Sequence, residues 1–184
     1  MGRLTGIIAT ALAAFLLSSA AAVEAGGRTD GPEASEHEQG GYPFGGPTAR
    51  FYISPAFGSG ILNSPETGSR SGLLYGVDVG YERDGWIGIQ AAYTYLSDQD
   101  LSIYSMGTRL AYPTDPFVYY ISAHAGLYAP EGRANHFGLA PGAGIDVVVS
   151  ERVRLGLNYK HDFIFRDTFT QDVDRVYAGV KLYF

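Results

Sequence analysis

The stretch YAGVKLYF at residues 177–184 alternates apolar and other side chains and ends on an aromatic residue. Successive side chains of a β-strand point to opposite faces, so residues two apart share a face. The apolar face of this segment consists of Val176, Ala178, Val180, Leu182 and Phe184. Chain ends usually fray. A regular apolar face that continues to the last residue therefore predicts that the final strand is paired along its whole length.

The same two-residue period extends backward through most of the chain. In residues 152–164, for example, Val153 and Leu155 alternate with Arg154. Such alternation is typical of strands with one apolar face. The pattern predicts eight strands at residues 49–58, 73–82, 86–96, 101–112, 117–129, 136–149, 152–164 and 172–184.

The expected connections between these strands alternate in length. The tight ones are residues 83–85, 113–116 and 150–151, and the longer ones are residues 59–72, 97–100, 130–135 and 165–171. Short periplasmic turns and longer external loops are typical of bacterial outer-membrane barrels, which have an even number of strands. The sequence therefore predicts an all-β fold, an eight-stranded antiparallel transmembrane β-barrel with an up-and-down meander.

The composition of the two faces decides between a membrane barrel and a secreted soluble β-domain, which would also alternate. The face opposite the apolar one carries small residues and charges of both signs. Such side chains would fill the narrow interior of an eight-stranded barrel as an ion-paired plug. The predicted lumen charge network consists of Asp78, Glu82, Arg109, Asp146, Arg154, Lys160, Asp162, Arg175 and Lys181. We therefore expect the apolar face to contact lipid.

Aromatic residues near the ends of the apolar faces support this orientation. Their positions predict two girdles at the membrane interfaces. They are Phe51, Phe57, Tyr75, Tyr81, Tyr93, Tyr95, Tyr112, Phe117, Phe163 and Phe184.

The first residues are typical of an exported protein. Arg3 precedes an apolar run, and small residues up to Ala25 fit a cleavage site. We expect a cleaved signal peptide at residues 1–25; an uncleaved anchor helix is the alternative. Residues 26–48 are rich in Gly, Pro and charge, which predicts a disordered periplasmic linker. The barrel then occupies residues 49–184, and we expect it to lie in the cell outer membrane.

The composition excludes several classes of function. The chain has no Cys, so it has no disulfide framework, thiol nucleophile or thiolate metal site. Its formal net charge of −6 argues against a nucleic-acid partner. We expect no cofactor and no metal centre.

Two segments resemble a known family. GLAPGAGIDVVVSERVRLGLNYKHDF at residues 138–163 and FVYYISAHAGLY at residues 117–128 are similar to strands of small OmpA-like and opacity-type outer-membrane barrels. The resemblance implies that the barrel assembly machinery reads the apolar face ending at Phe184 as a C-terminal signal. We expect neither a peptidoglycan-binding domain after the barrel nor the large adhesive loops of opacity proteins.

His161 is the strongest enzymatic candidate. It lies on the lipid-facing side of its strand. This position is similar to that of the catalytic His-x-Ser pair in the lipid A deacylases of the outer membrane. In this chain the second residue after His161 is Phe163, and the nearest downstream hydroxyl belongs to Thr168. A Ser–His–acid unit needs a hydroxyl beside the imidazole. We therefore expect no enzyme activity and interpret His161 as a polar residue of the rim.

Two further histidines and a set of carboxylates remain as binding candidates. His124 and His136 fall on the inward face. Two interpretations remain open for them: a metal or proton-relay site with Asp78, Glu82 or Asp162, or simple hydrogen bonding in the lumen. The outer rim is expected to be acidic, which suggests binding of divalent cations that bridge lipopolysaccharide phosphates, or simple solvation. The rim carboxylates are Asp98, Asp100, Glu131, Asp162, Asp167, Asp172 and Asp174.

The favoured function is a structural or surface-interaction role in the Gram-negative envelope. A narrow porin or channel is the main alternative, because inward glycines leave space in the lumen. These are Gly76, Gly80, Gly88, Gly142, Gly144, Gly156 and Gly179. A lipid A hydrolase is a third, disfavoured possibility. The expected partners are outer-membrane lipid, lipopolysaccharide and the assembly machinery, with the barrel as a monomer.

Overall fold

The computed structural model describes residues 49–64, 68–166 and 170–184. The predicted signal peptide at residues 1–25, the linker at residues 26–48, Asp167 and Thr168 lie outside these ranges. No helix in the described part of the chain is long and apolar enough to cross a membrane.

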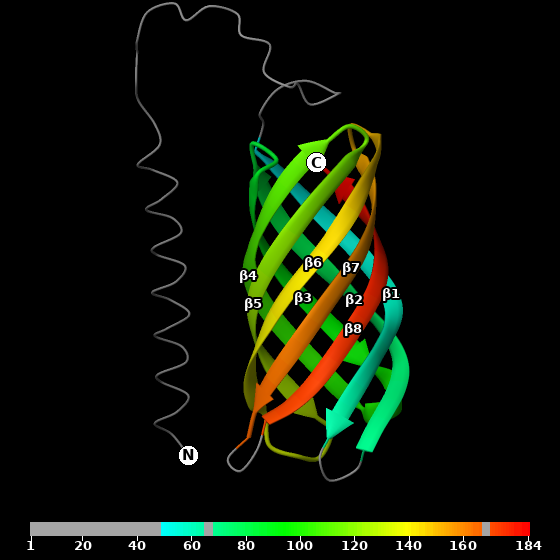
Figure 1. Cartoon of the computed structure of the whole chain (residues 1–184), viewed down its shortest axis with the longest axis vertical. Helices are drawn as coiled ribbons and strands as arrows, with labels where there is room; N and C mark the ends of the chain where they lie inside the picture. Colours follow the sequence, from blue (N-terminus) through cyan, green and yellow to red (C-terminus); the bar gives the residue numbers. More distant parts are fainter. Residues whose placement is uncertain (1–48, 65–67, 167–169) are drawn as a thin grey trace, which may run out of the picture. The chain divides into compact units, whose positions relative to one another are not determined.

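Eight antiparallel strands form a closed barrel in which each strand pairs with its neighbours in sequence and β1 pairs with β8 (Figure 1). The strands are β1 (Arg50–Ser64), β2 (Gly68–Arg83), β3 (Ile87–Leu96), β4 (Leu101–Thr114), β5 (Phe117–Pro130), β6 (His136–Ser150), β7 (Val153–Phe165) and β8 (Thr170–Tyr183). A short 3₁₀ helix, η1 (Ser97–Gln99), follows β3. The predicted meander barrel is confirmed.

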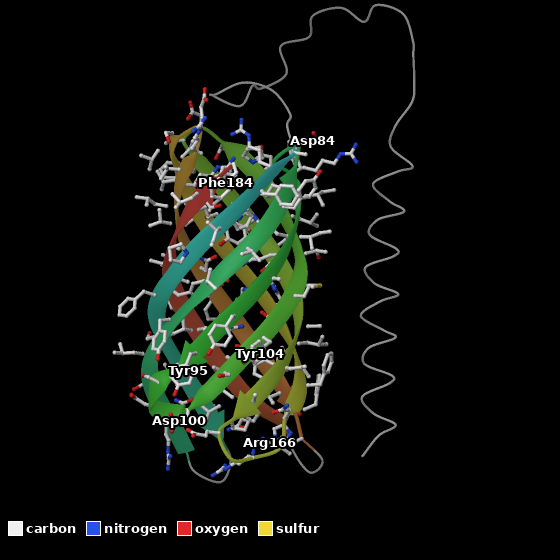
Figure 2. The ribbon with its side chains drawn as sticks, turned by 180° about the vertical axis from the view of Figure 1, so that it is seen from behind. Asp84, Tyr95, Asp100, Tyr104, Arg166 and Phe184 are labelled. Carbon is white, nitrogen blue, oxygen red and sulfur yellow. The ribbon has the colours of Figure 1, made fainter. Side chains whose placement is uncertain are left out.

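The two ends of the barrel differ, and we name them by their connections. The turn end carries the three tight turns, with Asp84 and the C-terminal Phe184, and the loop end carries Asp100 and Arg166 (Figure 2). The turn after β2 uses left-handed backbone at Asp84 (φ 54°) and Gly85 (φ 65°), as tight hairpin turns require.

The predicted loop at residues 59–72 was wrong. β1 and β2 continue their pairing to Ser64 and Gly68, and residues 59–63 of β1 also pair with β8. Gly and Ser in this stretch give a turn-like composition, but barrel closure supplies hydrogen-bond partners on both sides of β1. The remaining predicted bounds agree with the strands to within two residues.

The last strand is paired to the end of the chain, as its alternation predicted. β8 pairs with β1 from Tyr183 opposite Tyr52 to Asp172 opposite Asn63. The backbone N–H of Phe184 then donates to the carbonyl oxygen of Phe51 over 3.0 Å. Closing the sheet in this way leaves no open edge. The Phe184 side chain itself is 80% exposed and points away from the lumen.

The outer wall of the barrel is apolar and carries aromatic pairs toward both ends. At the turn end, the ring pairs are Phe51–Tyr81 (4.9 Å between centroids) and Trp86–Tyr112 (5.9 Å). At the loop end, they are Tyr75–Tyr95 (5.3 Å) and Tyr93–Tyr104 (5.1 Å). Figure 2 shows Tyr95 and Tyr104 on the wall toward the loop end. This arrangement is typical of a barrel whose wall faces lipid between two interfaces. Trp86 and Tyr104 were missing from the predicted girdle.

Candidate functional site

The structure places all nine residues of the predicted lumen charge network in the interior of the barrel. Each has a relative exposure of 7% or less. They do not form one continuous network. Two groups make direct ion pairs, and Asp78 and Lys160 lie between these groups without a direct ion pair to either.

The larger group lies at the turn end, and we call it the turn-end network. Arg109 bridges two carboxylates, at 3.3 Å from Glu82 and 2.6 Å from Asp146. Arg154 makes a second contact to Glu82 (3.2 Å), and Lys181 makes a second contact to Asp146 (2.7 Å). Each buried carboxylate therefore has two cationic partners, as buried ions need if they are to remain charged.

Tyrosine rings fill the space around these cations. The Arg109 guanidinium lies 3.8 Å from the ring centroid of Tyr120, and that of Arg154 lies 4.7 Å from Tyr183. Such cation–π contacts strengthen where water is excluded. The Tyr183 hydroxyl also donates to Glu82 over 3.1 Å. The turn end of the lumen is thus closed by charges and aromatic rings together.

The inward glycines at this end accommodate rings rather than solute. A Cβ at Gly80 would lie 2.4 Å from the Tyr52 ring, and a Cβ at Gly144 would lie 2.3 Å from the Tyr120 hydroxyl. Tyr52 and Tyr120 pack directly on these bare backbone positions. The interpretation of Gly80 and Gly144 as gaps for solutes was therefore wrong.

A second ion pair lies nearer the loop end. Arg175 binds Asp162 in a bidentate fashion, with Nε to Oδ2 at 2.5 Å and Nη2 to Oδ1 at 2.6 Å. The Tyr128 hydroxyl donates to the same carboxylate over 2.5 Å. Asp162 is therefore fully buried, and its expected place on the outer rim was wrong. The β7 alternation turns it inward between outward-facing His161 and Phe163.

Between the two groups lie Asp78, Lys160 and His124. Asp78 interacts electrostatically with Lys160 and with Arg175. The Lys160 ammonium has no hydrogen-bond partner among the described residues and lies 5.8 Å from the ring centroid of Tyr177.

His124 does not form the acid-assisted site that was considered for it. Its two ring nitrogens have no hydrogen-bond partner in the described part of the chain, and the charges that act on it belong to Lys160 and Arg175. His136 lies elsewhere, at the loop end. In residues 49–64, 68–166 and 170–184 no three His, Asp or Glu side chains group closely enough to hold a metal ion.

An apolar layer crosses the lumen on the loop-end side, which the sequence analysis did not predict. The side chains of this layer come from all strands except β6. They lie on the same inward faces that carry charged residues closer to the turn end. The layer consists of Ala56, Leu74, Leu96, Leu101, Ile103, Tyr128, Ile164, Val173 and Tyr177, with Leu62 packed against it. Leu74, Leu96, Ile103 and Val173 are completely buried. The two-residue period did contain this information, because it places Leu74 and Leu96 on the inward faces of their strands.

Above the apolar layer the loop end opens into a cavity of about 450 Å³, which we call the mouth cavity. Its floor includes Leu62, Leu101, Tyr128 and Ile164 from the apolar layer. Its polar lining consists of Arg70, Gln99, Asp100, Glu131, Arg133, His136, Arg166 and Gln171, and Pro130 completes the wall. Gln171 is buried, and its Oε1 has no hydrogen-bond partner within the described residues.

The charge of the mouth cavity corrects the expectation of a uniformly acidic rim. Three arginines and two carboxylates line the cavity, so its formal charge is +1 in a chain of net charge −6. The three arginines come from three different hairpins: Arg70 from β2, Arg133 from the loop after β5, and Arg166 from the segment after β7. Only barrel closure brings them together, and the sequence analysis missed them.

His161 faces outward, as its parity predicted, but it has an acidic partner that the sequence analysis missed. Its Nδ1 lies 2.7 Å from Oδ1 of Asp174, which is directly opposite on β8. The residues proposed as a C-terminal assembly signal lie on the same outward face of β8. Ala178 and Val180 follow Val176 there, and Leu182 and Phe184 complete the face.

No protein family model matches the chain, and no curated protein matches it by sequence. Solved structures do match. Neisserial surface protein A (NspA) is 21% identical with a TM-score of 0.61, and the match covers 73% of this chain and 97% of that one. The N-terminal β-barrel domain of OprF from Pseudomonas aeruginosa is 14% identical with a TM-score of 0.56, covering 74% and 99%.

The attachment invasion locus protein Ail of Yersinia pestis, in complex with the heparin analogue sucrose octasulfate, is 12% identical with a TM-score of 0.53, covering 74% and 99%. At these identities the likeness concerns the fold. The fold is that of the small, eight-stranded outer-membrane barrel. The expected resemblance to small OmpA-like barrels is thus confirmed at the level of architecture.

Proposed function

We propose that this chain is an integral outer-membrane barrel with a non-enzymatic, surface-interaction role, and that its lumen does not conduct. The observation that carries this proposal is the filling of the lumen by two successive closures. The turn-end network closes one end with ion pairs and tyrosine rings. The apolar layer closes the lumen below the mouth cavity mainly with hydrocarbon side chains. A hydrophobic constriction excludes ions by excluding their water.

The mouth cavity is the part of the barrel best suited to recognition. It opens at the loop end, which faces outside the cell in barrels with short periplasmic turns. It combines an apolar floor with a few polar groups, as ligand sites commonly do. Arg70 and Arg133 are exposed at its edge, so they can meet an anionic group on a soluble or surface-bound partner.

We expect the refolded protein to give no discrete conductance steps in planar bilayers. The reason is the apolar layer around Leu96 and Ile103, because a hydrophobic constriction excludes ions together with their water. A heat-modifiable shift in gel mobility would show that the protein had folded before the recording. Discrete steps from folded protein, changing in size in an Arg109→Ala variant, would reject the closed lumen and favour the channel alternative.

We expect a polysulfated sugar to bind the mouth cavity through its arginines. Sucrose octasulfate, the ligand named for the Ail structure, is a suitable probe for titration calorimetry in detergent micelles. Replacing Arg70 and Arg133 with Glu should weaken binding by about tenfold or more, because charge-assisted contacts are lost and repulsion is added. Raising the salt concentration should also weaken binding, because salt screens the attraction between the arginines and the sulfate groups.

The control for this titration replaces Arg83 and Arg152 with Glu, which changes the net charge by the same four units but at the turn end. Wild-type affinity in this control would assign binding to the mouth cavity. An equal loss in both variants would mean that only the overall charge of the protein matters, and the mouth cavity would then not be the recognition site.

A further inference from the structure

A polar cluster lies on the outer wall of the barrel near the loop end. Asp174 is its centre, because it accepts hydrogen bonds from the Tyr159 hydroxyl (2.7 Å), from His161 Nδ1 (2.7 Å) and from Asn63 Nδ2 (3.3 Å). The Ser69 hydroxyl in turn donates to Asn63 Oδ1 over 2.7 Å. We call these five residues the outer-wall cluster. It joins β7, β8, β1 and β2, which are consecutive around the barrel (Figure 1).

The cluster faces outward, where its surroundings are apolar. Ile61, Phe163 and Val176 are exposed on the same wall. A charged group facing lipid is costly at the middle of a bilayer and much less costly near the interface. Asp174 is the fifth residue of β8, so it lies on the order of 10 Å from the loop end of its strand. The aromatic pairs Tyr75–Tyr95 and Tyr93–Tyr104 lie toward the same end of the wall, where such rings are typical of the membrane interface, so the cluster is suited to the headgroup region of the outer leaflet.

The hydrogen bonds of the cluster fix its orientation. Because Nδ1 of His161 is held by Asp174, the other ring nitrogen is directed away from the carboxylate and has no hydrogen-bond partner among the residues that the structure describes. The His161 and Asp174 side chains are 28% and 31% exposed, so a neighbouring molecule can reach both. Phe163 supports the imidazole edge-on at 4.5 Å between ring centroids, and the Tyr159 ring is exposed beside it.

The chemistry of the cluster favours a sugar over a bare phosphate. A sugar ring presents hydroxyls at its edge, for which carboxylate, amide and imidazole groups are suitable partners, and C–H groups on its face, which pack on aromatic rings. A phosphate would meet the negative charge of Asp174. Apolar residues such as Val176 continue along the wall toward the turn end, where acyl chains attached to the sugar would lie.

We propose that the outer-wall cluster binds the sugar headgroup of an outer-leaflet glycolipid. The sugar hydroxyls contact His161 and Asp174, the ring packs against Tyr159, and the acyl chains follow the apolar wall of β7, β8 and β1. This inference rests on the proposed location in the outer membrane.

Native mass spectrometry of the refolded chain tests this assignment with two probes, a diglucosamine-based glycolipid and phosphatidylglycerol. The wild-type barrel is expected to retain the glycolipid in preference to phosphatidylglycerol. Asp174→Asn and His161→Ala should each reduce the retained glycolipid by about tenfold, because they remove the anchoring hydrogen bonds. Binding of phosphatidylglycerol should not change.

Two further variants keep the test decisive. Tyr159→Phe removes only the hydroxyl that fixes Asp174 and is expected to fold, so its weaker glycolipid binding would support the site even if another variant misfolds. Ser102→Ala is the matched control, because Ser102 meets Tyr93 at 3.5 Å on the opposite side of the outer wall, and it should bind as wild type. Equal retention in Asp174→Asn, or parallel loss of both lipids, would overturn the glycolipid site. Failure of the wild-type chain to bind either lipid would instead contradict the membrane location.

Discussion

Replacing Arg175 with Met is expected to lower the free energy of unfolding by about 3–5 kcal/mol, because it leaves a buried carboxylate without a cation. Asp162 is completely buried, and its two oxygens are held by Arg175 at 2.5 and 2.6 Å. Among the described residues, only the Tyr128 hydroxyl would remain as a direct partner after the substitution. Equilibrium unfolding in urea, with refolding in micelles, measures the loss.

The double variant Arg175→Met with Asp162→Asn separates lost charge pairing from lost packing. Removing both charges should restore a large part of the stability, since the penalty comes from the unpaired charge. Arg109→Met should cost less than Arg175→Met, although Arg109 bridges two acids. Glu82 keeps Arg154 and Asp146 keeps Lys181 as partners. A double variant no more stable than Arg175→Met would contradict the ion-pair explanation.

Replacing Leu96 with Ala is the second change with a large expected effect. Leu96 is completely buried in the apolar layer, and it packs so closely on β1 that a Cβ at Gly60 would lie 2.8 Å from its Cδ1. Deleting a buried Leu side chain costs about 2–5 kcal/mol, depending on how far the site can collapse. The free energy of unfolding should fall by this amount.

Leu73→Ala is the matched control for this substitution. Leu73 lies on β2 near the loop end, but it faces outward and is 56% exposed. Its truncation leaves no cavity in the lumen, so we expect a clearly smaller loss of stability. Equal losses for the two leucines would mean that the apolar layer is not packed as a core.

Membrane barrels of this size ordinarily have polar interiors, and this lumen is mixed. The turn-end network and the Arg175–Asp162 pair satisfy the charges, and the apolar layer separates them from the mouth cavity. An interior that is filled by side chains in this way stabilises the barrel and leaves the loop end for recognition. This division supports the proposal that recognition takes place at the mouth cavity.

Most of the fold was determined by the sequence, since alternation of period two specifies which side chains share a face. The inward charges at Glu82 and Arg109, the outward His161 and the paired last strand all follow from that parity. Strand ends were less certain, because the turn-like residues 59–63 of β1 become strand only when β8 closes the barrel.

Only the tertiary structure decided which of these side chains meet. Parity places Arg175, Asp162 and Lys160 in the lumen, but strand register and side-chain packing choose Asp162 as the partner of Arg175 and leave Lys160 without a hydrogen bond among the described residues. The same holds for Asp174 beside His161, and for the arginines around the mouth cavity. The register of the β7–β8 hairpin sets the contacts of Asp162 and of Asp174, whose partners are 13 residues away in the chain. Closure of the sheet brings the arginines together, because it sets the distances between strands that are far apart in the chain.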